Sequence, residues 1–138
     1  MKNNNKKQHK VNRNSKKGKK GLSRIYNALF YSLDGIKAAW VDEVAFRQIA
    51  VMAVIFIPIG IFLGESWIEK ILLVLPCVLC LVVELINSAI ENIVDLISLE
   101  INPLAKKAKD MGSAMQFIMC LFFVFVWISY VVCKYILL

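Results

Sequence analysis

Long apolar runs alternate with short polar segments along this chain. Two runs, at about 44–63 and 67–97, and a third at about 111–136 are each long enough to cross the roughly 30 Å hydrocarbon core of a bilayer as a helix. Between the second and third runs, residues 98–110 are polar and contain Pro103, which is expected to break a helix. The pattern therefore predicts three transmembrane helices, with a loop over 98–110.

Ahead of these runs, residues 22–40 carry apolar side chains at spacings of three and four, with polar side chains between them. This periodicity predicts an amphipathic helix, and its aromatic residues are typical of a helix that lies in the membrane interface. The expected fold class is an all-α membrane protein, with an N-terminal amphipathic surface helix followed by three transmembrane helices. The expected organisation is a disordered basic tail over 1–20 and one integral membrane domain over 21–138.

Charge is distributed unevenly around the net value of +7. Residues 1–24 hold ten Lys and Arg and no acid, whereas the rest of the chain holds seven basic and ten acidic residues. The tail is too polar to bury a core, and its lysines predict attraction to anionic lipid headgroups. The simpler alternative is a solvated tail that only sets topology. Nucleic-acid binding is possible on charge alone but is disfavoured by the membrane body.

Basic residues also predict the orientation in the membrane. The tail and surface helix hold most of them, and the segment after the second run adds Lys106, Lys107 and Lys109. The turn between the first two runs holds only Lys70. The N-terminus and the lysine segment are therefore expected in the cytoplasm, and the C-terminus on the other side.

The second apolar run ends in a polar stripe, whose members are Glu84, Asn87, Ser88, Glu91 and Asp95. At about 100° per residue their spacing places them on one face of a helix. A carboxylate deep in a membrane helix costs roughly 2.5 to 3.5 kcal/mol, so acids on one face indicate a functional site. The alternative interpretation is a seam of hydrogen bonds between helices, in which Asn87 and Ser88 join neighbouring helices.

Another carboxylate, Glu43, precedes the first run and is expected at a depth similar to that of Glu91. Carboxylates on two helices with lysines nearby suit Mg²⁺ and a polyphosphate, because Mg²⁺ usually takes one or two carboxylates together with substrate phosphate. A deeper acid such as Glu84 suits a general base. The chain has no GxxxxGK[ST] loop and no glycine-rich loop of the soluble kinases.

Two non-enzymatic alternatives remain at this point. A proton or ion pathway would use buried acids, but it predicts them through the full depth of the membrane. None occurs between Lys70 and Glu84, and none follows Asp110 in the third run. A small structural or regulatory membrane subunit would not need carboxylates and lysines in one layer.

Three stretches carry a resemblance to a known family: AAWVDEVAFRQ at 38–48, VELINSAIENIVD at 83–95 and AKKAKDMGSA at 105–114. Over about 22–132 the chain resembles the prokaryotic diacylglycerol kinases, which are small three-span membrane lipid kinases. The resemblance implies ATP-dependent phosphorylation of the hydroxyl of diacylglycerol to phosphatidic acid at the cytoplasmic face, with Mg²⁺ as cofactor. It also implies a homotrimer in the bacterial inner membrane, with the C-terminus in the periplasm. A second subgroup phosphorylates undecaprenol and remains an alternative, although DEVAFRQ and KDMGSA are similar to the diacylglycerol subgroup.

The resemblance further implies roles for single residues. The catalytic residues would be Glu84 as base, Asn87 and Asp95, and the metal-binding residues Glu43 and Glu91. The residues at ATP would be Arg24, Tyr31, Glu43, Glu91, Glu100, Lys109 and Asp110. The residues at the lipid substrate would be Ser32, Trp40, Arg47, Gln48, Glu84 and Ser113.

Overall fold

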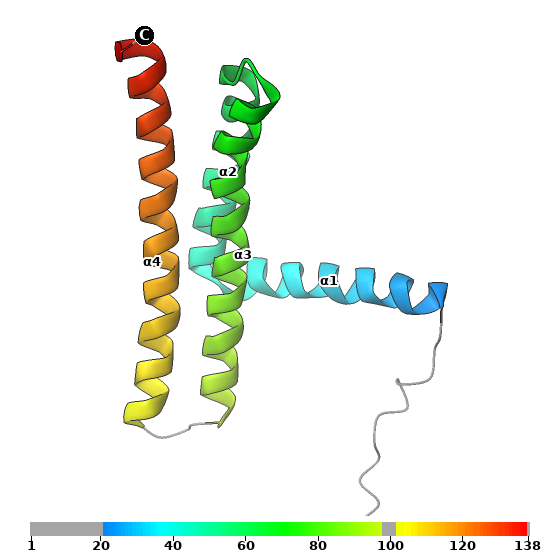
Figure 1. Cartoon of the computed structure of the whole chain (residues 1–138). Coiled ribbons are helices and arrows are strands. Elements are labelled where there is room, and N and C mark those ends of the chain that lie inside the picture. The colour runs from blue at the N-terminus through cyan, green and yellow to red at the C-terminus, as the bar shows by residue number, and fades with distance from the viewer. Residues whose placement is uncertain (1–20, 98–101, 138) are drawn as a thin grey trace, which may run out of the picture. The chain divides into compact units, whose positions relative to one another are not determined.

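The computed structural model describes residues 21–97 and 102–137 (Figure 1). Within these ranges all regular secondary structure is helical, which confirms the predicted fold class. In chain order they are α1 (Leu22–Asp42), α2 (Val44–Leu63), α3 (Trp67–Ile97), α4 (Pro103–Val132) and a short π-helix, η1 (Cys133–Leu137). The described helices include three that are long and apolar enough to cross a membrane, at 44–63, 67–97 and 103–136. The predicted basic tail over 1–20 and the predicted nucleotide contact Glu100 lie outside the described residues.

Contacts divide the chain into two compact units, Met1–Gly35 and Ile36–Leu138. In the first unit, the helical residues expose a row of apolar side chains that includes Ile25, Leu29 and Leu33. Aromatic side chains join this row, and the rings of Tyr26 and Phe30 lie 4.6 Å apart. An exposed apolar row on a helix is the surface that an interfacial helix presents to lipid.

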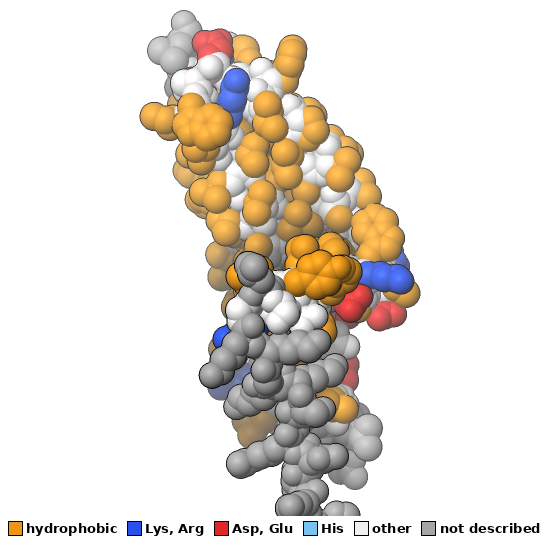
Figure 2. Space-filling model, turned by 90° about the vertical axis from the view of Figure 1, so that its right-hand side faces the viewer, with side chains coloured by type: hydrophobic (Ala, Val, Ile, Leu, Met, Phe, Trp, Pro, Cys, Tyr) orange, Lys and Arg blue, Asp and Glu red, His pale blue; other side chains and the backbone are white. Residues whose placement is uncertain are grey.

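In the second unit, α3 packs against both α2 and α4 (Figure 1). The buried core contains Ala53, Leu73, Cys77, Cys80, Phe123, Trp127 and Tyr130. Phe56 of α2 meets Phe123 and Trp127 of α4 edge to face, at ring-centroid distances of 5.0 and 4.9 Å. Edge-to-face contacts are a favoured aromatic geometry, and here they join the two helices that flank α3. The flank of this unit is covered by hydrophobic side chains, as expected of a surface that faces lipid (Figure 2).

A close approach of the helices depends on Gly60 of α2. A Cβ atom there would lie 2.9 Å from Cβ of Leu73 and 3.4 Å from the ring of Trp127. Small residues at such contacts let membrane helices pack closely. Gly60 therefore determines how tightly α2 fits against α3 and α4.

The predicted start of the third transmembrane helix, near Met111, is wrong. The helix begins at Pro103, the residue that was expected to break it. A proline at the first helical position lacks an N–H group that would have had no partner there, so it begins a helix well. The side chain of Asn102 completes the cap by accepting a hydrogen bond of 2.8 Å from the backbone N–H of Leu104. Two more turns of α4 therefore replace most of the predicted loop.

Candidate functional site

The polar stripe of α3 runs from the buried interior of the unit to its exposed end. Glu84 is only 2% exposed, Asn87 8% and Ser88 5%. Glu91 is partly buried, and Asp95 is exposed. The stripe therefore offers its deepest carboxylate beside the apolar interior and its last one to water.

Asn87 lies where α4 closes over the stripe. Its amide nitrogen donates a hydrogen bond of 3.3 Å to Oε1 of Glu91. Its amide oxygen is buried without a hydrogen-bond partner. Gly112 of α4 packs directly against this oxygen, and a Cβ atom at Gly112 would overlap it. The glycine thus lets α4 approach without displacing Asn87 from Glu91.

Glu43 is joined to α3 through a residue that the sequence reasoning missed, Asn92. Glu43 has extended backbone angles and stands between α1 and α2. Its Oε1 accepts a hydrogen bond of 3.3 Å from the amide nitrogen of Asn92, which also donates to the backbone oxygen of Ser88 at 2.8 Å. Asn92 follows Glu91 and falls at the edge of the polar stripe, so its position on the helix was a usable signal.

The structure brings three of the predicted acids together. Glu84 lies close enough to Glu91 and Glu43 for their charges to act on it. Among the described residues, no group of three or more His, Cys, Asp and Glu side chains is arranged to hold a metal ion by itself. Mg²⁺ is usually held by one or two carboxylates and the phosphates of a substrate. Glu43 and Glu91, each with an oxygen held by an asparagine amide, fit this second arrangement.

Lys109, one of the two cations predicted at the nucleotide, stands on α4 near Lys106, and each of these lysines is paired with an acid. Nζ of Lys109 contacts both carboxylate oxygens of Asp95, at 2.7 and 2.9 Å. Lys106 pairs with Asp110 at 2.7 Å, one helical turn away. Surface ion pairs of this kind contribute little free energy, so an incoming phosphate can compete for the lysines.

The residues predicted at the lipid substrate are spread over both units. Nη1 of Arg47 donates to the backbone oxygens of Trp40 and Val41, at 2.8 and 2.9 Å, so its guanidinium holds the end of α1. Gln48 and Ser113 are exposed. In the first unit, Ser32 makes a hydrogen bond within its own helix, and that unit also holds Arg24 and Tyr31.

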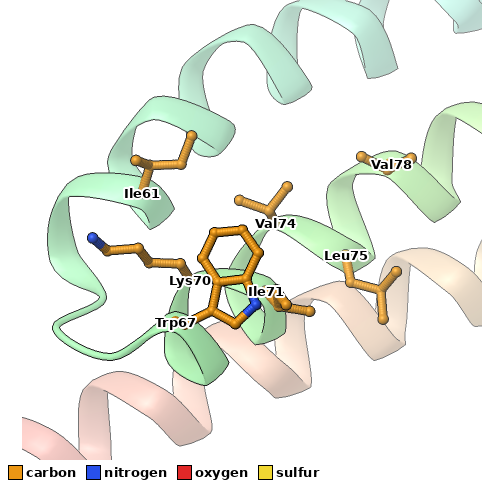
Figure 3. A pocket seen from close by; sticks show the side chains of 7 residues that line it. All are labelled: Ile61, Trp67, Lys70, Ile71, Val74, Leu75 and Val78. Carbon is orange, nitrogen blue, oxygen red and sulfur yellow. The ribbon is translucent and has the colours of Figure 1, made fainter.

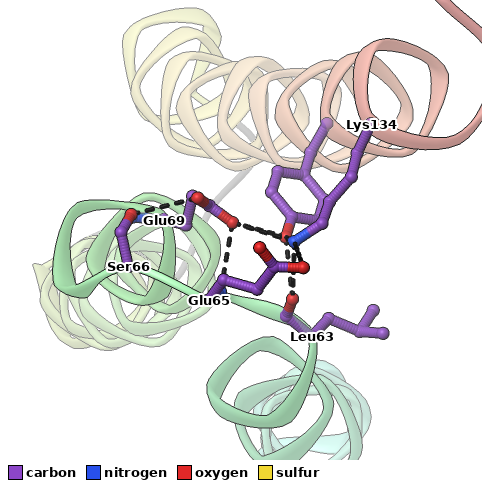
Figure 4. Close-up of polar contacts among 6 residues, drawn as sticks. Leu63, Glu65, Ser66, Glu69 and Lys134 are labelled. Atoms are coloured by element: carbon purple, nitrogen blue, oxygen red, sulfur yellow. Dashed lines mark hydrogen bonds and ion pairs between the residues drawn. The ribbon is translucent and has the colours of Figure 1, made fainter. Parts of the chain in front are cut away.

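A second polar group, here called the Lys134 cluster, occupies the opposite end of α4 (Figure 4). Its members are Glu65, Glu69, Tyr130, Lys134 and the backbone oxygen of Leu63. Nζ of Lys134 lies 3.1 Å from a carboxylate oxygen of Glu65, 3.1 Å from one of Glu69 and 2.9 Å from the hydroxyl of Tyr130. The sequence reasoning did not predict this cluster, because its members are far apart in the chain.

A groove of about 360 Å³ lies beside α2 and α3, near the turn that joins them (Figure 3). It is lined by Ile61, Trp67, Lys70, Ile71, Val74, Leu75 and Val78. Lys70 is its one charged lining residue, and it holds no carboxylate. The groove therefore has no candidate for a base or a metal ligand. The polar stripe of α3 remains the candidate functional site.

Comparison with known proteins adds an independent observation. Residues 30–131 match the model of a family described as prokaryotic diacylglycerol kinase. A diacylglycerol kinase of Helicobacter pylori is 50% identical over 116 residues, which cover 84% of this chain and 91% of the relative. One from Pseudomonas aeruginosa is 53% identical over 102 residues, covering 74% of this chain and 83% of the relative. One from Escherichia coli is 41% identical over 107 residues, covering 78% and 88%.

Proposed function

This chain belongs to the prokaryotic diacylglycerol kinase family, and from that membership we propose that it transfers the γ-phosphate of ATP to the hydroxyl of diacylglycerol. The product would be phosphatidic acid, made at the cytoplasmic face of the inner membrane. The observation that carries the proposal is the group of Glu84, Glu91 and Glu43, in which a buried carboxylate lies within range of the charges of two partly exposed ones. A lipid kinase needs this combination, because its two substrates arrive from an apolar and an aqueous phase.

In the proposed reaction, Glu84 acts as general base. Its carboxylate takes the proton of the lipid hydroxyl while the hydroxyl oxygen attacks the γ-phosphorus, and the bond from that phosphorus to the β-bridging oxygen breaks to release ADP. Asn87, which contacts Glu91 on the neighbouring turn, orients the groups around the base. Asp95 keeps Lys109 in place until the nucleotide arrives.

Glu43 and Glu91 are the residues that would hold Mg²⁺. The ion, when bound, supplies positive charge to the phosphate oxygens. Both carboxylates already receive a hydrogen bond from an asparagine amide, which fixes one oxygen and leaves the other for a ligand. Lys109 and Asp110 on the two extra turns of α4, together with Arg24, Tyr31 and Glu100, are the proposed nucleotide contacts.

For the lipid, we propose contacts from the exposed Trp40, Gln48 and Ser113, and from Ser32 and Arg47. We also propose a homotrimer, with the C-terminus in the periplasm and with the basic tail near anionic headgroups. The three apolar helices support a membrane location, and the distribution of lysines supports this orientation.

The test is phosphate transfer from γ-labelled ATP and Mg²⁺ by the purified protein, in mixed micelles that hold equal amounts of diacylglycerol and undecaprenol. Label in phosphatidic acid is the expected result, and the Glu84→Gln variant is the control. Label in undecaprenyl phosphate would keep the mechanism and change the substrate. A well-folded protein that labels neither lipid would contradict the proposal.

A further inference from the structure

A row of residues on α4 faces α3. One member of this row, Gln116, is polar and has not been assigned a function above. The row consists of Gly112, Gln116, Met119, Cys120 and Phe123, all buried or partly buried. Apart from Gln116 its members are small or hydrophobic. An amide in such a row needs hydrogen-bond partners, because an unpaired buried polar group is costly.

Two contacts determine the level of α3 at which Gln116 lies. Towards the start of α4, Gly112 packs on Asn87. Towards its middle, the thiol of Cys80 contacts the backbone oxygen of Met119 at 3.8 Å, and it also interacts with the side chain of Cys120. The two helices are antiparallel, so α3 residues between Cys80 and Asn87 lie opposite α4 residues between Met119 and Gly112. Glu84 and Gln116 occupy this same layer.

The hydrogen bonds of this layer are incomplete in a specific way. The amide nitrogen of Gln116 contacts only the sulfur of Cys120, at 3.7 Å, and its amide oxygen is buried without a partner. The amide oxygen of Asn87, on the other side of Glu84, is also buried without a partner. No side chain in the described part of the chain donates a hydrogen bond to the carboxylate of Glu84. The layer therefore contains two amide oxygens that receive no hydrogen bond, one on each side of Glu84.

We propose that Gln116 is a positioning residue for Glu84. The amide oxygen of Gln116 accepts a hydrogen bond from the carboxyl group of Glu84 once that group has taken the proton of the lipid hydroxyl. The proton moves from the hydroxyl to Glu84 and stays there until the phosphorylated lipid leaves, so no further reactant is needed. This inference rests on the proposed function, because it assumes that Glu84 is the base. With Gln116, a residue of α4 supports the proposed catalytic residues of α3.

The first test is the Gln116→Met variant, which keeps the length of the side chain and removes the amide. We expect kcat to fall about 10-fold, as for the loss of one buried hydrogen bond, while KM for ATP and for the lipid stays within about twofold. The matched control is Ile118→Met on the exposed side of the same helix, which should keep the kcat of the unchanged chain.

The second test separates positioning from packing by combining Gln116→Met with Glu84→Asp, which withdraws the carboxyl group. If Gln116 acts through Glu84, the methionine should cost less than about threefold in this background, because the contact is already lost. Equal losses in both backgrounds, or a normal kcat in Gln116→Met alone, would overturn the inference and leave the kinase assignment intact. Failure of the unchanged protein to phosphorylate any lipid would instead overturn the proposed function.

Discussion

Two polar groups lie in the same helical unit and differ in how their charges are satisfied. In the Lys134 cluster, one lysine contacts two carboxylates and a hydroxyl, and the hydroxyl of Tyr130 also contacts the backbone oxygen of Leu63 at 2.8 Å. In the polar stripe, Glu84 is buried beside other acids, and the oxygen of Asn87 has no partner. Both carboxylates of the first group are paired with a lysine, whereas in the second group only Asp95 is, within the described residues.

This difference distinguishes polar groups that stabilise the fold from polar groups that are available for a reaction. Buried polar groups in folded proteins almost always have partners, so a site without them calls for an explanation. The Lys134 cluster ties the turn after α2 to the end of α4, which is a structural role. The stripe holds uncompensated acceptors at the depth where a lipid hydroxyl would enter. The four changes below test whether the two groups have these separate roles.

The largest effect is expected from Glu91→Gln. Loss of one carboxylate from the proposed metal pair should lower kcat/KM by at least about 10³-fold, because such an ion stabilises the phosphate charge by several kcal/mol. The measurement is phosphate transfer by protein that elutes normally in detergent. Glu65→Gln makes the same chemical change in the Lys134 cluster and should keep activity. Near-normal turnover of Glu91→Gln would remove this residue from the metal site.

Next in size is Glu84→Gln, which removes the proposed base. Its kcat should fall by about 10²- to 10³-fold, the usual contribution of general base catalysis, with little change in the affinity for ATP. Steady-state kinetics at saturating lipid and direct binding of a non-hydrolysable nucleotide would separate the two quantities. A variant that loses nucleotide binding but keeps the chemical step would assign Glu84 to the nucleotide instead.

A smaller effect is expected from Gly112→Ala. The added methyl group overlaps the amide oxygen of Asn87, which must rotate and give up its hydrogen bond to Glu91. We expect a loss of about 10-fold in kcat, in line with one buried hydrogen bond, and a minor change in thermal stability. Gly60→Ala is the matched substitution in the core, where the methyl group meets Leu73 instead. That variant should lose stability first, and the opposite pattern would contradict the comparison.

The smallest effect on activity is expected from Lys134→Met. This change removes the cation from the Lys134 cluster and should lower the thermal midpoint by a few degrees, because Glu65 and Glu69 then face each other without it. Activity per folded molecule should stay within about twofold, because the cluster is at the far end of α4 from the stripe. Thermal unfolding followed by residual activity measures both quantities. A strong loss of turnover in stable protein would show that the two groups are coupled.

Local patterns were enough to predict the helices and the stripe. The apolar runs predicted the spanning helices because a bilayer demands length and hydrophobicity together. The spacing of Glu84, Asn87 and Glu91 predicted one helical face, and the structure places all three on it. The position of Glu43 just before the first apolar run predicted a depth similar to that of Glu91, and the hydrogen bond from Asn92 provides the physical contact with α3.

Features that depend on contacts between distant residues could not be predicted in this way. Pro103 was interpreted as a helix breaker, although a proline can equally begin a helix, and only the cap by Asn102 decides between these outcomes. Gln116 was not predicted as a site residue, since its importance depends on what α3 places opposite it. The partners of Lys134 could not be predicted either, because α3 and α4 separate Glu65 from Lys134 in the chain.

The face of α4 that packs against the rest of its unit also has a consequence for variation in the gene. Gly112 at the stripe and Tyr130 at the Lys134 cluster are eighteen positions apart, which is about five turns of an α-helix. They therefore lie on the same face of the helix, Gly112 at the polar stripe and Tyr130 at the Lys134 cluster. Inserting or deleting a single codon between them would rotate one end by about 100° against the other. Natural variation in the length of this gene should consequently avoid the segment 112–130, even where the identities of its side chains change freely.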